Sequence, residues 1–475
     1  MNRMYLIGLM VLALLAPAAR AAGEAFPPGF TESTMTDLAS GLRVNVVSGG
    51  KPGAPTVVLI HGLGQAASKD WLPVLPALAA TYRVLMFDLP GFGASERPNA
   101  VLSPKKYADL VHWLIARHTT GQVFVVGHSL GAAVALRHSY DYPQQVARLL
   151  LIDAAGILQT TVFARHLLKV PEQVTTVPVL NKLAGAGSRI LNHFSGQFQD
   201  LTADNAGALA ALAGSDRARG MLYKDSSNVN AALALANEDF SPYLRDMKVP
   251  VWMLWGDQDA VAPLRTGEAL QWLLPQSQLH VLPGVGHVPM SQASYQTGEW
   301  MLQSLVAPLP PLRSDESQVS HGDGACKDQD GQVFSGRWRT IRLEHCAHVR
   351  IENATLEQLV VVRSKVALEN VQIRSQTTAL EATRAVILAT GLRISAPRAW
   401  RLDDSRLDLA ALDVSARELG EEKGGTLIFL SLGHWCDGSD EWRMHGVWRP
   451  SKGPLDPQFR TLREGACTAP AKAIP

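Results

Sequence analysis

The chain has 475 residues, with 44 lysines and arginines against 43 aspartates and glutamates. This length exceeds what one ordinary hydrophobic core accommodates, so we expect two domains. The formal net charge is +1 and no run of basic residues exceeds two, which argues against nucleic acid as a partner, because polyanion binders carry a basic stripe. With 47% hydrophobic and 18% charged residues, the chain is also too apolar to be disordered.

The N-terminus has the pattern of a secretory signal peptide. Arg3 precedes an apolar run from Met4 to Ala16, and a small-x-small stretch follows up to Ala22. A short membrane anchor is the alternative, but this run is shorter than the roughly 17 residues that a helix needs to cross a bilayer. We therefore expect residues 1–22 to be removed near Ala21 or Ala22. The mature protein is expected to be exported, periplasmic or secreted, with no membrane span.

All four cysteines lie in the last third of the chain: Cys326, Cys346, Cys436 and Cys467. An even number in an exported chain predicts two disulfides, for which three pairings are possible. Zinc ligation is the alternative, because His345, Cys346 and His348 are close in sequence and His434 precedes Cys436. The chain has no Cys-x-x-Cys pair, and an oxidising compartment favours disulfides. We therefore expect no metal site.

Residues 26–306 alternate short β-branched runs with longer helical patterns. We predict strands at Leu42–Val47, Thr56–Ile60, Arg83–Asp88, Gln122–Val126, Leu149–Asp153, Val249–Trp255 and Gln278–Leu282. Several are almost continuously apolar, as strands buried on both faces of a parallel sheet are. Helical patterns lie between them, for example at Pro104–His118 and Leu130–His138. The alternation predicts a doubly wound, mostly parallel α/β domain.

One gap interrupts this alternation. About 95 residues between Asp153 and Val249 show helical patterns and no clear strand, which is too long for a crossover connection. We expect a helical cap subdomain at about 156–248. A Pro-rich segment followed by a polar stretch predicts a linker over 307–324.

The pattern changes in residues 325–475, where short alternating segments replace the helices. Ile351, Ile373, Ile394 and Val414 recur at intervals of 22, 21 and 20 residues. Inward-facing positions at this period favour the rungs of a right-handed parallel β-helix. A jelly roll or a β-sandwich is the alternative. The periodicity resembles that of pectate-lyase-like β-helices, but the acidic residues alternate with apolar ones as on solvated rungs, so we predict no calcium-dependent lyase site. These residues are Asp403, Asp404, Asp408 and Asp413.

The most informative stretch is Val123–Ala133, in which Gly-x-Ser-x-Gly spans Gly127 to Gly131 around Ser129. A buried strand leads into this motif, and a helix that begins with small residues follows. The turn needs glycine two residues on either side of the serine, and it lifts the hydroxyl to the carboxyl edge of the sheet. We therefore predict Ser129 as a nucleophile. The alternative is an ordinary strand–helix loop that contains a serine.

A serine nucleophile needs a base, and the base needs an orienting carboxylate. A later strand ends in acidic residues, and His287 follows the next strand in a Gly-rich loop. We predict His287 as the base and Asp259 as the acid, because the Gly-x-x-Asp-x-x-x-Pro loop that contains Asp259 would aim it at the histidine. Asp257 and Asp153 are the rival acids.

The oxyanion that forms on attack needs two hydrogen-bond donors. The backbone N–H of Leu130 lies at a helix N-terminus, where negative charge is favoured. The second donor is expected in the loop His61–Gly64, where flanking glycines let the N–H of Leu63 approach substrate. We predict that these two N–H groups form the oxyanion hole, without a contribution from the leucine side chains.

Residues 26–306 resemble the α/β-hydrolase superfamily in this turn and in the order Ser…Asp…His. The stretch Asp88–Ser95 resembles a loop shared by capped esterases, carbon–carbon bond hydrolases, haloalkane dehalogenases and epoxide hydrolases. That loop is mainly structural in those families, so Asp88 receives no catalytic role. Dehalogenases and epoxide hydrolases carry aspartate at the position of Ser129, which argues against both. The resemblance implies no cofactor and no metal.

Together these patterns predict an exported serine hydrolase that cleaves a small-molecule or polymeric ester through an acyl-enzyme intermediate. A carbon–carbon bond hydrolase with the same triad is the first alternative. A carbohydrate-binding protein whose C-terminal domain carries the function is the second, and a non-catalytic binding module on a hydrolase fold is the third. We expect the cap to select the substrate. The C-terminal domain is expected to dock a carbohydrate or a protein, or only to stabilise the chain.

Overall fold

The computed structural model describes residues 25–158, 231–311, 322–448, 460–463 and 467, apart from positions 38, 65, 99–101, 232, 233, 236, 237 and 439. The chain forms two compact units whose main boundary lies between Leu312 and Arg313. The predicted leader (1–22) and most of the predicted cap (156–248) and linker (307–324) lie outside the described residues. Across the described ranges, no helix combines the length and apolarity needed to cross a bilayer.

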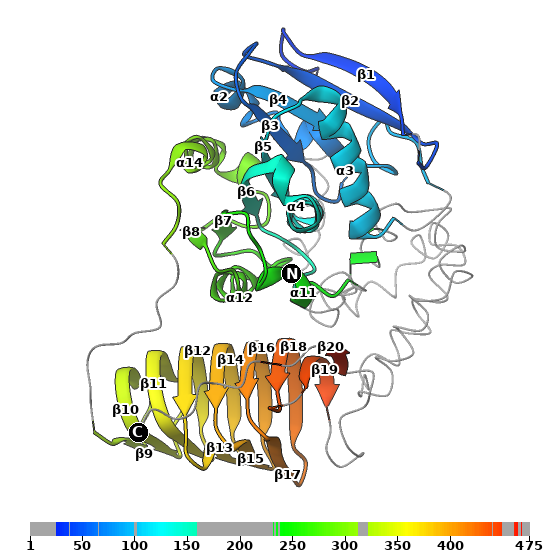
Figure 1. Ribbon diagram of the computed structural model, residues 1–475. Helices are drawn as coiled ribbons and strands as arrows, with labels where there is room; N and C mark the ends of the chain where they lie inside the picture. The colour runs from blue at the N-terminus through cyan, green and yellow to red at the C-terminus, as the bar shows by residue number, and fades with distance from the viewer. Residues whose placement is uncertain are drawn as a thin grey trace, which may run out of the picture. The chain divides into compact units, whose positions relative to one another are not determined.

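The first unit is built on an eight-stranded sheet in the order β1-β2-β4-β3-β5-β6-β7-β8 (Figure 1). The strands are β1 (Thr31–Thr36), β2 (Arg43–Gly50), β3 (Thr56–Ile60), β4 (Arg83–Phe87), β5 (Val123–His128), β6 (Val146–Ile152), β7 (Val251–Gly256) and β8 (Ser277–Leu282). Only the pairs β1–β2 and β2–β4 are antiparallel. The predicted mostly parallel sheet is therefore confirmed. β1 was not predicted, because the mostly exposed sequence TESTMT of this edge strand has no apolar pattern.

Helices flank this sheet. They are α2 (Leu75–Ala79), α3 (Pro104–His118), α4 (Leu130–Asp141), α11 (Ser241–Leu244), α12 (Arg265–Leu273), α13 (Pro289–Gln292) and α14 (Ser294–Val306), with short 3-10 helices η1 (Ala67–Trp71) and η2 (Pro143–Gln145). Figure 1 shows the sheet between the α2–α14 pair and the α3–α4 pair. Every residue of β3 and β7 is buried, and their sequences are almost continuously apolar, as in strands covered on both faces of a sheet.

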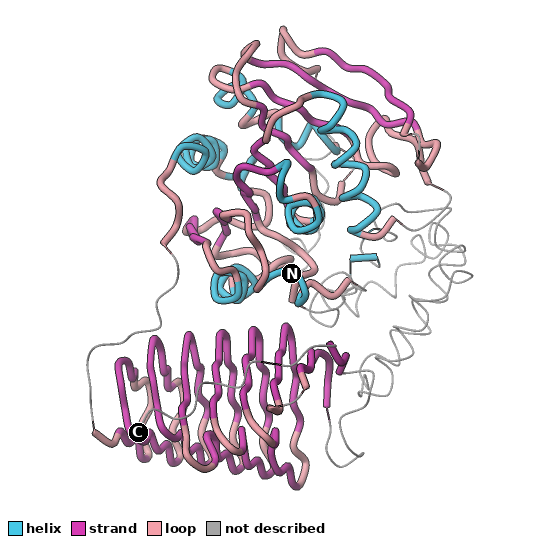
Figure 2. The backbone as a smooth tube through the Cα atoms, in the orientation of Figure 1, coloured by secondary structure: helices cyan, strands magenta, loops and turns pink. Residues whose placement is uncertain are grey.

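The second unit is a stack of parallel strand coils (Figure 2). Its strands are β9 (Gly324–Lys327), β10 (Val333–Glu344), β11 (Val349–Val362), β12 (Lys365–Arg374), β13 (Thr378–Thr383), β14 (Val386–Ser395), β15 (Arg398–Asp403), β16 (Arg406–Ser415), β17 (Glu418–Lys423), β18 (Leu427–Cys436), β19 (Glu441–Trp448) and β20 (Arg460–Arg463). One ladder joins β12, β14, β16 and β18, and another joins β13, β15 and β17. Every pair up to β18 is parallel, so this all-β unit is a curled sheet of the β-helix kind rather than an antiparallel sandwich or jelly roll.

The repeat seen in the sequence is the stacking of these coils. Ile373, Ile394 and Val414 are aligned partners in successive strands, and all three side chains are fully buried. The placement of Ile351 in the same column is wrong, because Ile351 pairs with Leu368. The long strand β11 pairs with β12 through its first part and with β13 through its second, so the first coils do not keep the spacing of the later ones.

Two disulfides close the two ends of this stack. Cys326, in β9, is joined to Cys346, directly after β10, and Cys436 at the end of β18 is joined to Cys467. The prediction of two disulfides is confirmed, and the fold selects one of the three pairings. The zinc alternative is wrong, because all four thiols are consumed.

We predict that Cys326→Ser with Cys346→Ser destabilises the second unit. The bond closes a loop of 20 residues, which corresponds to roughly 3 kcal/mol of unfolding free energy on the chain-entropy estimate. Denaturant unfolding followed through tryptophans of the second unit measures the difference. Non-reducing peptide mapping is the companion measurement, and any Cys326–Cys436 linkage would contradict the assigned pairing.

Candidate active site

A strained turn carries Ser129 between β5 and α4. Its φ of 52° lies in the left-handed region, which is costly for a residue with a side chain. A Cβ on Gly127 would lie 2.3 Å from the carbonyl oxygen of Gly131, and a Cβ on Gly131 would lie 2.1 Å from that of Ile60. Both glycines are therefore required by close backbone approach, as the sequence motif predicts.

The structure brings Ser129, His287 and Asp259 into one hydrogen-bonded line. The Oγ of Ser129 lies 2.9 Å from Nε2 of His287, and Nδ1 of His287 lies 2.7 Å from Oδ2 of Asp259. Oδ1 of Asp259 accepts the backbone N–H groups of Val261 and Ala262, which hold the carboxylate in this orientation. Nδ1 donates to the carboxylate, so Nε2 is left to accept the serine proton.

The two rival acids, Asp257 and Asp153, bond backbone N–H groups instead of His287. Oδ1 of the exposed Asp257 accepts the N–H of Gly284, and Oδ1 of Asp153 accepts the N–H of Gly256. Asp153 is fully buried, and burial together with the charge of Asp259 raises its pKa well above the usual range. Both carboxyls therefore support the loops that follow β7 and β8, rather than orienting His287.

The loop after β3 lies against the nucleophile turn. A Cβ on Gly62 would lie 2.9 Å from both the Cβ of Ser129 and the Nδ1 of His128. The N–H groups of Leu63 and Leu130 make no hydrogen bond to the described part of the chain, and Leu130 is the first residue of α4. The N–H of Leu130 thus directly follows Ser129 and that of Leu63 directly follows Gly62, and neither predicted donor is consumed by secondary structure.

His61 shapes this loop, a role that the sequence reading did not assign. Nε2 of His61 accepts the N–H of Leu89 at 2.9 Å, so Nδ1 carries the proton and donates to the carbonyl of Gly62 at 2.7 Å. Burial lowers the pKa of His61 and keeps its ring neutral. A histidine directly after a buried strand was the available signal, but only the partners reveal its role.

Asp88 holds the neighbouring loops together, as the resemblance implies. Its Oδ1 accepts the N–H and the hydroxyl of Ser68, and its Oδ2 accepts the N–H of Ala94 and the amide of Asn45. All of these partners are structural, and none belongs to the Ser129 line.

A group that could hold a metal ion by spacing lies at the same place. Ligand atoms of His128, Asp153 and His287 are within 4.8 Å of one another. Hydrogen bonds already engage both ring nitrogens of His287 and the Nε2 of His128. His128 and His287 are joined by a hydrogen bond and Asp153 bonds the N–H of Gly256, so we assign no metal to these three residues.

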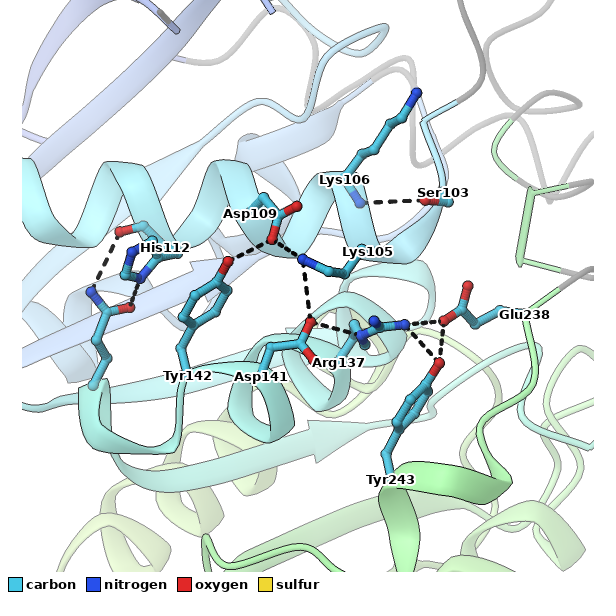
Figure 3. Close-up of polar contacts among 11 residues, drawn as sticks. Ser103, Lys105, Lys106, Asp109, His112, Arg137, Asp141, Tyr142, Glu238 and Tyr243 are labelled. Carbon is cyan, nitrogen blue, oxygen red and sulfur yellow. Dashed lines mark hydrogen bonds and ion pairs between the residues drawn. The ribbon is translucent and has the colours of Figure 1, made fainter. Parts of the chain in front are cut away.

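A second polar network joins α4 to the returning segment around Glu238 and Tyr243, at the end of the predicted cap (156–248) (Figure 3). Arg137 of α4 donates to Asp141 and, at 2.6 Å each, to Glu238 and the hydroxyl of Tyr243. Burial and Glu238 raise the pKa of Tyr243, so its hydroxyl stays protonated. Charged hydrogen bonds to a half-buried arginine thus hold this returning segment against α4.

Comparison with known proteins places residues 55–293 in the family described as the alpha/beta hydrolase fold. An uncharacterized protein of Mycobacterium tuberculosis (strain ATCC 25618 / H37Rv) is 30% identical over 249 residues, which are 50% of this chain and 70% of the relative. A 2-hydroxy-6-oxo-2,4-heptadienoate hydrolase of Pseudomonas putida is 28% identical over 258 residues, covering 53% of this chain and 88% of the relative. The crystal structure of a bacterial membrane phospholipase A has 21% identity and a TM-score of 0.43, covering 64% of this chain and 98% of that chain.

Asp70 of η1 is a second titratable group near the predicted oxyanion loop. Its Oδ2 lies 4.0 Å from the position that a Cβ on Gly64 would take. Burial and the charge of Asp88 raise the pKa of Asp70 from 3.8 to about 7. An acid with a raised pKa in the folded state takes up a proton on folding, so the contribution of Asp70 to stability is fully present only below its unfolded pKa. This stability is lost as pH rises from about 4 to about 7.

We predict that Asp70→Asn stabilises the protein at about pH 8 and has little effect at about pH 4, because only the wild type then carries a buried charge. Urea unfolding at several pH values measures the gap between the two proteins. Asp257→Asn, at an exposed carboxyl, is the matched control. A gap that does not change with pH would contradict the raised pKa of Asp70.

Proposed function

The chain belongs to the α/β-hydrolase fold family, and on that premise we propose that it is an exported serine hydrolase that cleaves a carboxylic ester. Membership of this family makes the protein a hydrolase. The proposal that it is a serine hydrolase acting on an ester rests on one further observation. This is the unbroken hydrogen-bonded line from Ser129 through His287 to Asp259. A serine hydroxyl next to an imidazole that is itself held by a carboxylate is the arrangement that activates serine for attack.

In the proposed reaction, Oγ of Ser129 attacks the ester carbonyl carbon while Nε2 of His287 takes its proton. Asp259 stabilises the imidazolium that forms. The oxyanion of the tetrahedral intermediate accepts the N–H groups of Leu63 and Leu130. Collapse expels the alcohol, which receives the proton from His287, and leaves the acyl group on Ser129.

Water then completes the cycle. His287 removes a proton from a water molecule that attacks the acyl carbonyl carbon. The second tetrahedral intermediate releases the carboxylic acid, and the proton returns to Oγ of Ser129. Each step uses the same three side chains and the same two backbone donors, and no cofactor takes part.

The two disulfides are compatible with the proposed export, and therefore with an ester substrate outside the cytosol, because disulfides persist in oxidising compartments. The second candidate is a carbon–carbon bond hydrolase, which the relative from Pseudomonas putida favours. A panel of simple esters and a dienoic diketone acid separates the two. We further propose that the second unit docks a carbohydrate or a protein.

We predict that a fluorophosphonate probe adds once to the mature protein and does not add to Ser129→Ala. The activated serine attacks phosphorus, because His287 takes the proton of its hydroxyl. Intact mass spectrometry measures the adduct. Ser291→Ala, which removes an exposed hydroxyl bonded to a backbone carbonyl, is the control that should still be labelled. A well-folded wild type without any adduct would refute the proposed mechanism.

Asp259→Asn should lower kcat for an ester by about 10⁴-fold, because the amide stabilises neither the imidazolium nor the required tautomer of His287. Asp257→Asn should stay within about threefold of the wild type, because the exposed carboxylate of Asp257 accepts the N–H of Gly284 and does not contact His287 in the described hydrogen bonds. Steady-state kinetics on the two variants measure the difference. Equal losses in both would contradict the assignment of the acid.

A further inference from the structure

His128 is a buried histidine that the proposed reaction does not use. It is the last residue of β5, directly before Ser129, and is 4% exposed. Its Nε2 lies 2.7 Å from the backbone carbonyl oxygen of His287, and the two imidazole rings have their centroids 5.1 Å apart. A side chain of the nucleophile strand therefore holds the main chain of the proposed base.

This hydrogen bond determines the tautomer of His128. A carbonyl oxygen only accepts, so Nε2 must carry the proton and donate. Nδ1 then has a lone pair, and it has no hydrogen-bond partner in the described chain. Complete burial and the neighbouring His287 lower the pKa of His128 to about 3. The ring is thus a neutral donor, and its bond does not change over the pH range of the reaction.

The opposite edge of the ring faces the oxyanion loop. A Cβ on Gly62 would lie 2.9 Å from Nδ1 of His128, so the backbone of this loop packs directly against the imidazole. The imidazole of His128 therefore lies between two loops. One is the loop after β3, which carries the proposed oxyanion donor Leu63, and the other carries His287. The size of the ring and its donor position set the distance between these two loops.

The loop that carries His287 needs such a restraint. It follows β8 and contains Gly284 and Gly286, and glycine leaves the backbone many alternative conformations. The N–H of Gly284 is held by Asp257, and that of Gly286 by Gln292. The carbonyl of His287 itself is held only by His128 among the described hydrogen bonds.

We propose that His128 is a positioning residue whose Nε2–H holds the carbonyl of His287, so that the imidazole stays in line between Ser129 and Asp259. The proposal rests on the proposed function and adds a fourth side chain to it. Neutrality matters, because a positive charge on His128 would oppose the imidazolium that forms on His287 during the reaction. The protein thus anchors its base with a polar group that carries no charge.

Two variants separate the hydrogen bond from the packing. His128→Leu removes the donor, and His128→Gln keeps an N–H donor on a side chain of similar reach. We expect His128→Leu to lower kcat about 10²-fold with KM within about twofold of the wild type, because a base displaced by about 1 Å aligns poorly with the serine. His128→Gln should recover most of kcat. If His128→Leu does not fold, His128→Phe keeps a ring without a donor and replaces it.

Proton NMR of the Nδ1–H of His287, bonded to Asp259, supplies a readout that needs no substrate. We expect this low-field resonance in the wild type and in His128→Gln, and its loss or broadening in His128→Leu. Unchanged kcat together with an unchanged resonance in His128→Leu would overturn the proposal. If the wild type hydrolyses no ester yet the resonance depends on the donor as expected, the proposed function fails while the anchoring role of His128 stands.

Discussion

The close approach of two backbones at the nucleophile turn is the constraint on which the site depends. The carbonyl of Ile60 occupies the space that a side chain on Gly131 would need, and the carbonyl of Gly131 does the same to Gly127. These close approaches force a tight turn between β5 and α4, and Ser129 at its centre has a positive φ. This contact places the loop after β3 beside the serine, where the proposed oxyanion donors lie.

The other two members of the line come from loops, and buried polar groups restrain both. Asp153 holds the N–H of Gly256 at the start of the acid loop, and His128 holds the carbonyl of His287. The N–H of Gln258 donates to the carbonyl of Val285, which ties the acid loop to the base loop. The side chains of Asp153 and His128 are buried, and an unpaired polar group there would cost about 1–3 kcal/mol, so departures from the aligned geometry are disfavoured.

The second unit depends on a different constraint, because it repeats one strand coil and each coil is held by hydrogen bonds to its neighbours. Each coil bends at a residue of positive φ, and these residues stack in a column formed by Asn353, Asn370, Gly391, Ala411 and Leu432. Asparagine and glycine tolerate this conformation at low cost, but alanine and leucine do not. Neighbouring coils impose the bend on Ala411 and Leu432, because the parallel ladder continues on both sides of each residue.

The sequence by itself determined the alternation of strands and helices, the turn around Ser129, and the inward-facing column at Ile373, Ile394 and Val414, because these depend on local periodicity and on the steric needs of glycine. The sequence does not reveal the polar edge strand β1, its periodicity puts Ile351 in the wrong column, and it leaves the cysteine pairing open. Only the tertiary structure decided which carboxylate faces His287 and what His61 and His128 do. Those answers depend on contacts between loops that lie from 28 to 159 residues apart, and residue type and spacing along the chain do not encode such contacts.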